Sequence, residues 1–373
     1  MRTWTRRLAG AMPLLLLVAC ARRGESVAAA SECQLSQVNG SVIVKDVPSN
    51  VAPYADGVVS VGTRFEGSAG GAMAAFGTAG SWDPELIAAL GHHVIELDDV
   101  SSLGDQAWAV GALASSGPIA VRWDGDAWVP AAVADPGPGE DGFAGVDMLS
   151  ADQVWAVGRH QRGSGFETLI ERWNGSAWTI VPSPDVGTIS DQLNDVDATR
   201  ASDAWAVGWY VQAQRYRPLV EHWDGSRWSV VPTPNPGGGD AFLSGVVATG
   251  PDDAWAVGWT ARGDALTPLV EHWDGGSWRL VAGPSEVPDG SFAAVAATPT
   301  GIVAVGRALT PQSHPLVAEL QGSAWSIVPT PVTDPAWLTG VTVDASNAIW
   351  TVGTVFPPNG LAGSLVLTGC PAS

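Results

Sequence analysis

The chain has 373 residues, of which 46% are apolar, 18 are basic and 38 are acidic, so its formal net charge at pH 7 is −20. This apolar content is sufficient for a large buried core and excludes a mostly disordered chain. The negative charge excludes nucleic acid as a partner, because the surface would repel it and no stripe of basic and aromatic residues offsets the repulsion.

The first 19 residues have the layout of a signal peptide. Three arginines precede the uncharged run Leu8–Ala19, which at 12 residues is too short to span a bilayer as a helix. The run ends Leu-Val-Ala-Cys20, which resembles the lipobox of bacterial lipoproteins. The resemblance implies removal of residues 1–19, lipidation of Cys20 and anchoring on the outer face of the cell membrane. An ordinary secretory signal with an incidental cysteine is the alternative.

After Cys20 we expect a short tether to residue 33 and a folded domain over residues 34–370. Removing residues 1–19 removes three arginines and no acidic residue, which leaves 15 basic and 38 acidic residues and a net charge of −23. Cys33 and Cys370 are then the remaining cysteines, and in an exported protein the simplest prediction is one disulfide between them. A free or scrambled pair is the alternative.

The rest of the chain is a repeat. The phrase Trp-Ala-Val-Gly or a weaker version of it ends at seven glycines spaced 47–50 residues apart: Gly62, Gly111, Gly158, Gly208, Gly258, Gly306 and Gly353. A second phrase follows after about fifteen residues, for example Glu221–Trp228 (EHWDGSRW), and a Val-Pro-x-Pro ending comes next. A period of this length is typical of propellers and solenoids.

Each unit predicts four strands. In the best-formed unit they are residues 193–199, 204–211, 217–223 and 227–234, and Asp224-Gly225 supplies a hairpin turn between the last two. The inner strands are nearly continuous apolar runs, as expected for a sheet covered on both faces. We therefore predict an all-β fold, a seven-bladed β-propeller of four-stranded antiparallel blades.

The repeat resembles the kelch repeat, whose group includes the central domain of galactose oxidase. Val207-Gly208 corresponds to the kelch glycine pair, Glu221-His222-Trp223-Asp224 to the Glu-x-Tyr-Asp phrase, and Pro232-Thr233-Pro234 to the exit. This chain has one glycine where kelch has two, and Trp for Tyr, so WD-repeat and Asp-box propellers remain alternatives. The copper-radical chemistry of galactose oxidase is not implied, because it needs a Tyr-Cys crosslink and no cysteine is spare.

The ends of the periodic part predict how the ring closes. Val38–Ser49 matches a fourth strand with its entry turn, and Gly363–Cys370 matches a third strand. We expect the N-terminal segment to complete the last blade, so that no sheet edge is exposed. Cys33 and Cys370 would lie beside this seam.

Most of the 19 tryptophans fall on the repeat lattice and are expected to be core residues between blades. His222 and His272 occupy positions that hold arginine in neighbouring units, so a structural role is expected for them. No nucleophile elbow, zinc-protease motif, phosphate loop or dinucleotide fingerprint is present. The sequence thus predicts no catalytic residues, no cofactor and no metal site.

The loops between second and third strands should emerge on the same face of the ring as the loops between blades. Arginine, histidine and aromatic side chains from the former would face carboxylates from the latter, a combination that suits a saccharide or an acidic peptide. A solvated rim of mixed charge is the alternative. The candidate ligand-binding face consists of Arg159, His160, Arg162, Trp209, Arg215, Tyr216, Arg217, Trp259, Arg262 and Arg307.

These observations favour a cell-surface lipoprotein whose propeller is a non-catalytic binding or scaffolding module for an envelope protein or glycan. A glycan-active hydrolase or lyase that uses loop carboxylates on the same face is the alternative function.

Overall fold

The computed structural model describes residues 34–38, 43, 45–66, 69–90, 95–113, 117–134, 136–310, 312–358 and 360–371. The signal peptide, Cys20 and Cys33 lie outside these residues, as does the side chain of Cys370. The lipidation and disulfide predictions therefore remain predictions. No helix of the described part is long and apolar enough to cross a membrane.

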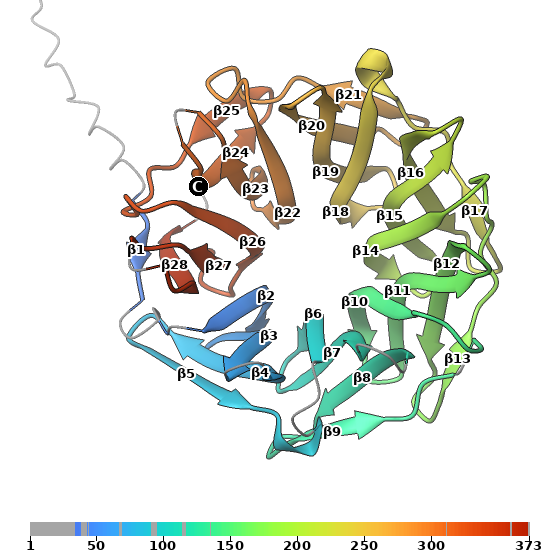
Figure 1. The fold of residues 1–373 in the computed structure, drawn as a ribbon, viewed down its shortest axis with the longest axis horizontal. Coiled ribbons are helices and arrows are strands. Elements are labelled where there is room, and N and C mark those ends of the chain that lie inside the picture. Colours follow the sequence, from blue (N-terminus) through green and yellow to red (C-terminus); the bar gives the residue numbers. More distant parts are fainter. Residues whose placement is uncertain are drawn as a thin grey trace, which may run out of the picture. The chain divides into compact units, whose positions relative to one another are not determined.

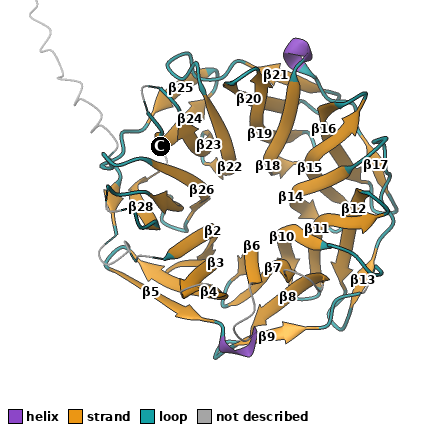
Figure 2. Ribbon diagram, viewed as in Figure 1, coloured by secondary structure: helices purple, strands orange, loops and turns teal. Residues whose placement is uncertain are grey.

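The described chain is a ring of seven four-stranded antiparallel sheets, the seven-bladed propeller that the repeat predicts (Figures 1 and 2). The innermost strands of blades 1 to 7 are β2 (Asp46–Tyr54), β6 (Ile95–Leu103), β10 (Gly142–Ser150), β14 (Asp191–Arg200), β18 (Asp240–Gly250), β22 (Gly290–Thr298) and β26 (Ala336–Val343). The second strands are β3 (Gly57–Glu66), β7 (Gln106–Leu113), β11 (Gln153–Arg162), β15 (Asp203–Gln212), β19 (Asp253–Arg262), β23 (Gly301–Ala308) and β27 (Ala348–Val355).

The third strands are β4 (Ala69–Thr78), β8 (Gly117–Trp123), β12 (Gly165–Trp173), β16 (Arg215–Trp223), β20 (Ala265–Trp273), β24 (His314–Gln321) and β28 (Gly363–Pro371). The outer strands of blades 1 to 6 are β5 (Ser81–Leu86), β9 (Trp128–Ala131), β13 (Trp178–Ile180), β17 (Trp228–Val230), β21 (Trp278–Val281) and β25 (Ala324–Ile327). Two short 3-10 turns, η1 (Ala88–Leu90) and η2 (Pro236–Gly238), are the helical elements of the described residues.

The N-terminal segment closes the ring as predicted, but through a different stretch of chain. The outer strand of blade 7 is β1 (Ser36–Gln37), which pairs with β28 in the register Ser36 to Thr368. The prediction of a fourth strand over Val38–Ser49 is wrong in its bounds. Val38 N donates to Val366 O of β28 and Ile43 O accepts from Ser364 N, but from Asp46 onward the chain belongs to β2, the innermost strand of blade 1. β1 covers part of the outer edge of β28, and backbone hydrogen bonds of Val38 and Ile43 to Val366 and Ser364 extend this cover.

The hydrophobic core is divided into seven clusters, each lying between two adjacent blades. Lattice tryptophans lie in six of these clusters, and in three of them a second-strand tryptophan inserts between two tryptophans of the next blade. The second-strand Trp205 of blade 4, for example, inserts between Trp273 and Trp278 of blade 5, with ring centroids 4.9 and 5.2 Å away. Because every blade gives one apolar face to each neighbour, its strands are apolar on both faces.

The two repeat histidines brace these tryptophans. His222 lies 4.3 Å from the ring of Trp205, and its Nε2 is 2.7 Å from a carboxylate oxygen of Asp203. His272 makes the same contacts with Trp255, at 4.1 Å, and Asp253, at 2.7 Å. The Asp224-Gly225 hairpin is present, with four residues between the paired Trp223 and Trp228.

Glycine is required at the repeat position because the inner strand leaves no room for a Cβ. In every blade the inner strand carries a one-residue bulge, and the repeat glycine of the second strand pairs with the residue just before it. A Cβ on Gly208 would lie 2.0 Å from the carbonyl oxygen of Gln192. A bulge redirects the side chain of its extra residue. The seven bulge residues are Ser49, Asp98, Ala144, Asn194, Ser244, Ala293 and Thr339, and all of them line the mouth of the central channel.

Candidate functional site

We call the face that carries the loops between second and third strands the upper face, and the opposite one the lower face. The ten predicted ligand-face residues all lie at the upper ends of second or third strands, in blades 3 to 6. Hydrogen bonds join the two kinds of loop on this face, as from Gln161 N to the Asp141 carboxylate (2.6 Å) and from Leu266 N to the Asp289 carboxylate (3.0 Å). The prediction that both kinds of loop emerge on the same face is therefore confirmed.

Blade 3 uses its candidates for internal contacts. Nδ1 of His160 lies 2.9 Å from the Asp141 carboxylate, which is almost fully buried. Arg159 donates to the side chain of Gln192 (2.9 Å), and its guanidinium lies 4.5 Å from the ring of Phe166. These side chains join blade 3 to its own loop and to blade 4.

Carboxylates that the sequence placed opposite a ligand instead accept hydrogen bonds from the backbone. Asp240, at the start of blade 5, accepts from Tyr216 N of blade 4 at 3.1 Å. Arg215 lies 4.0 Å from the same carboxylate. Asp191 is buried and accepts from Val186 N and Gly187 N at 2.6 and 2.9 Å. These acids hold loops in place through backbone hydrogen bonds.

The remaining aromatic candidates form a continuous cluster across blades 4 and 5. Trp209 and Tyr216 are in edge-to-face contact at 5.1 Å, and Tyr216 lies 4.7 Å from Phe242. Phe242 stacks on Trp259 at 4.1 Å with an interplanar angle of 23°. The cluster therefore supports one side of the Trp259 ring.

Trp259 also forms one wall of a pocket of about 260 Å³ that lies over blade 6. We call this the tryptophan pocket. Its other walls are Arg307 of blade 6 and Trp337 of blade 7, and the hydroxyl-bearing Ser244 and Ser291 contribute to its lining. The small residues Ala293 and Gly306 leave the space open between the walls. Of the ten predicted residues, Trp259 and Arg307 are the two that meet here.

The pocket walls are supported from behind. Trp337 packs on Phe356 with ring centroids 4.3 Å apart, and the Arg307 guanidinium lies 5.8 Å from the Trp337 ring. Arg307 is half-buried, and among the described residues it has no carboxylate partner. The pocket thus combines two fixed aromatic walls with an uncompensated positive charge.

The sequence analysis missed Trp337 and Phe242. Trp337 does not fall on the repeat lattice, and the same is true of Trp209 and Trp259. Lattice tryptophans lie between blades, whereas these three lie on the upper face. Departure from the lattice was therefore the signal that would have found Trp337.

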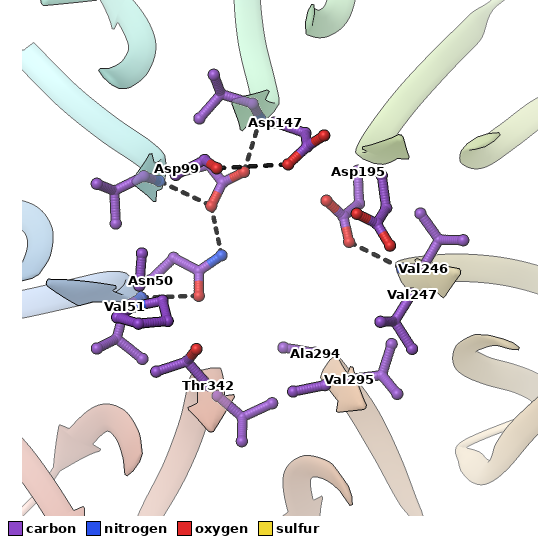
Figure 3. A pocket seen from close by; sticks show the side chains of 18 of the residues that line it. Asn50, Val51, Asp99, Asp147, Asp195, Val246, Val247, Ala294, Val295 and Thr342 are labelled. Atoms are coloured by element: carbon purple, nitrogen blue, oxygen red, sulfur yellow. Dashed lines mark hydrogen bonds between the residues drawn. The ribbon is translucent and has the colours of Figure 1, made fainter. Parts of the chain in front are cut away.

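The central channel adjoins the tryptophan pocket. Its upper part has a volume of about 330 Å³ and shares Ser244, Ala293 and Thr339 with the pocket. Its lower part, of about 310 Å³, is acidic on one side and mainly apolar on the other, as the aspartates and the valines of Figure 3 show. Four aspartates line this lower part: Asp99, Asp147, Asp195 and Asp197.

These aspartates join neighbouring inner strands. Asp99 of blade 2 accepts from Val146 N of blade 3 (2.7 Å), and Asp195 of blade 4 accepts from Val246 N of blade 5 (2.8 Å). Burial raises the pKa of Asp99 to about 6 and that of Asp195 well above its usual range. The channel carboxylates therefore connect blades. In the described residues no group of His, Cys, Asp or Glu is arranged to bind a metal ion.

Asp98 differs from these acids because it is a bulge residue at the upper mouth of the channel. Burial raises its pKa to about 8, and the neighbouring carboxylates of Glu96 and Asp99 add to the effect. Asp98 is thus mostly protonated at neutral pH, and it lies in the space that continues into the tryptophan pocket.

No protein-family model matches the chain, and no curated protein matches its sequence. Among solved structures the chain is similar to "YCF48 bound to D1 peptide", with a TM-score of 0.57 and 14% identity over 91% of this chain and 95% of that one. Two structures of the Aleuria aurantia lectin, each 14% identical over 79% of this chain and 98% of that one, are also similar. One is in complex with Fucα1-6GlcNAc (TM-score 0.48), and the other is described as a six-bladed propeller with a novel fucose recognition mode (TM-score 0.49). At this identity the likeness to the first structure shows the propeller fold, and the ligand has to be argued from the site.

Proposed function

We propose that this protein is an exported lipoprotein with a kelch-like propeller that acts as a non-catalytic binding module. Its ligand, an envelope glycan or protein, binds in the tryptophan pocket of the upper face. The observation that carries the proposal is the pairing of Trp259 and Trp337, each backed by a phenylalanine, around the uncompensated Arg307. Concave sites with aromatic walls and a few polar groups are typical of ligand-binding sites.

The sequence supports the cellular context of this proposal. The arginine-led apolar run that ends at Cys20 has the layout of a lipoprotein signal. Two or more acyl chains on Cys20 would give a stable anchor, whereas a single chain binds a membrane only marginally. The propeller would then be held at the outer face of the cell membrane, where envelope glycans and proteins are within reach.

One observation favours the enzymatic alternative. Asp98, with its pKa near 8, could donate a proton to a ligand that extends from the tryptophan pocket into the channel mouth. A glycosidase of the usual kind also needs a second carboxylate placed across the bond to be cleaved. The carboxylates nearest to Asp98 are Asp99, which is bound to the backbone of blade 3, and the exposed Glu96. We therefore keep binding as the main proposal.

The test is retention of envelope material by the immobilised full-length protein and by variants. Trp259→Ala and Trp337→Ala should each lower retention at least about tenfold, because a central aromatic anchor contributes on the order of 2 kcal/mol. Arg262→Ala, on the same face but outside the pocket, is the matched control and should retain the ligand as well as wild type does. Bound protein and bound carbohydrate are quantified separately.

The same experiment separates binding from catalysis. Retained material that is recovered unchanged supports a binding module. Material that is cleaved by wild type but not by Asp98→Asn would establish the enzymatic alternative. Equal retention by wild type and both tryptophan variants would show that the ligand binds elsewhere.

A further inference from the structure

Arg307 gives the tryptophan pocket a positive charge that no carboxylate of the described residues pairs with. Acidic residues outnumber basic ones by 38 to 18, and several arginines are paired with them, as in Arg64–Asp46 and Arg162–Glu167, both at 2.7 Å. Arg307 is half-buried, and instead of an acidic side chain its guanidinium lies over the ring of Trp337. A half-buried cation without a counter-ion favours the binding of an anion.

The surroundings of Arg307 limit the kind of anion. A chain with a net charge of −20 repels a multiply charged ligand at long range. A carboxylate carries a single charge and matches the planar guanidinium with two parallel hydrogen bonds. A ligand with one carboxylate at the pocket therefore gains the local contact at the smallest long-range cost.

The walls and size of the pocket indicate what carries that carboxylate. Trp259 and Trp337 are flat surfaces held in place by Phe242 and Phe356, at 4.1 and 4.3 Å. The volume of about 260 Å³ lies just below the range of roughly 300–1,000 Å³ occupied by drug-sized ligands, so it suits one ring-sized group. The hydroxyls of Ser244 and Ser291 offer donors and acceptors to the polar edge of such a ring.

An extended acidic peptide fits this geometry less well. Peptides that bind propellers and other sheets by strand addition need an open edge. The strands around the pocket belong to the interior of their sheets: β19 pairs with β18 and β20, and β23 pairs with β22 and β24. The pocket itself, at about 260 Å³, holds one ring-sized group, and it continues into the mouth of the central channel rather than along a sheet edge.

We propose that the tryptophan pocket binds a uronic acid residue of a glycan, with its carboxylate on Arg307 and its ring between Trp259 and Trp337. This proposal rests on the proposed function, because it assigns the ligand class of the same site. It assigns separate tasks to the walls: Arg307 selects for the carboxylate, and the two tryptophans bind the sugar ring whatever its charge.

The test is a binding titration of the purified full-length protein with a panel of otherwise neutral oligosaccharides that each carry one galacturonic, glucuronic or mannuronic acid residue. Each oligosaccharide is paired with its carboxyl-reduced, uncharged counterpart, and a short peptide with one glutamate and equal net charge is included. At least one acid should bind about 10- to 100-fold more tightly than its reduced counterpart, because a charge-assisted arginine contact is lost on reduction. Arg307→Gln should abolish that preference, whereas Arg262→Gln, the matched control, should keep it.

A salt series adds a second readout. Raising the ionic strength to about 0.15 M screens the long-range repulsion more than the short Arg307 contact, so affinity should stay constant or rise. A steep loss of affinity with salt would indicate a polyanion bound by many charges and would overturn the proposal.

The remaining outcomes separate the two proposals. Equal binding of acids and reduced counterparts, lost in Trp259→Ala, would overturn the uronic acid while leaving the pocket as the binding site. Tighter binding of the glutamate peptide, or retention of an envelope protein with no glycan bound, would also overturn it. Glycan binding that survives Trp259→Ala and Trp337→Ala would overturn both the pocket and the ligand class.

Discussion

Replacing Trp205 by alanine should lower the free energy of unfolding by about 3–5 kcal/mol, the usual cost of removing a large aromatic side chain from a packed core. Trp205 is almost completely buried, and its ring contacts Trp273, Trp278 and His222 at 4.9, 5.2 and 4.3 Å. The loss would leave a cavity between blades 4 and 5. Urea unfolding followed by tryptophan fluorescence measures the effect.

Trp209→Ala is the matched control for this prediction. Trp209 lies four residues further along β15, on the upper face, where it is half-buried and off the repeat lattice. Its removal should cost no more than about 1 kcal/mol. If the two variants were equally stable, the lattice tryptophans would not hold the blades together in the way described above.

Replacing Glu171 by glutamine should remove part of the pH dependence of stability. Glu171 is fully buried between blades, accepts one hydrogen bond from Ala134 N at 3.0 Å, and has a second carboxylate oxygen without a partner in the described part of the chain. Burial raises its pKa to about 7 from an ordinary value of 4.5. The folded protein therefore keeps this proton at a pH where the unfolded chain has lost it.

The sign of the effect follows from this difference. The contribution of Glu171 to stability is fully present below pH 4.5 and is lost as the pH rises through 7, a loss of about 3 kcal/mol. Glutamine keeps an acceptor for Ala134 N and has no proton to lose. Urea unfolding at pH 5 and pH 8 should show wild type losing about 3 kcal/mol more than the variant.

Glu140→Gln is the control for the pH experiment, because Glu140 is exposed in a loop and its replacement should leave the wild-type pH dependence unchanged. Parallel pH profiles for wild type and Glu171→Gln would mean that the Glu171 carboxylate is solvated or paired in the folded protein. Glu221 and Glu271 occupy the same position in blades 4 and 5, and burial raises their pKa in the same direction.

The fold could be predicted from the sequence because the residues that determine it, the repeat glycines and the lattice tryptophans, recur at regular spacing. The repeat glycine recurs wherever the second strand passes a bulge of the inner strand, as at Gly208 beside Gln192 and Leu193, where a Cβ has no room. The lattice tryptophans recur because each blade must fill the same gap to the next blade. Regular spacing of both features is enough to give the number of blades and the order of strands.

The closing strand was misplaced because it is too short to have a pattern. β1 consists of Ser36 and Gln37, and no periodicity can identify two residues. The longer and more apolar Val38–Ser49 was predicted as the whole fourth strand, whereas Val38 and Ile43 only extend the edge contact with β28 and the end of the stretch begins β2. Register with β28, which only the folded ring provides, decides between the two segments.

The candidate site was predicted in part, because strand order gives the face on which a residue lies but not the contacts of its side chain. The positions of Trp259 and Arg307 at the upper ends of second strands follow from strand order, and so both residues were expected on one face. Sequence could not show that Asp141 and Asp240 are held by backbone N–H groups, because a loop aspartate reads the same whether it faces a ligand or caps a turn. Nor could it show that Trp337 of blade 7 and Trp259 of blade 5 line the same pocket, because that depends on how three successive blades pack against one another.

The most direct test of the account is to locate the ligand on the protein. Indole Nε1–H signals of the tryptophans are followed by NMR while the material eluted from the immobilised protein is titrated in. We predict shifts for Trp259 and Trp337 and none for Trp123, which lies at the lower face and donates its indole N–H to the Tyr54 hydroxyl at 2.8 Å. Shifts at Trp123 with none at Trp259 and Trp337 would contradict the account, because the ligand would then bind on the opposite face of the ring.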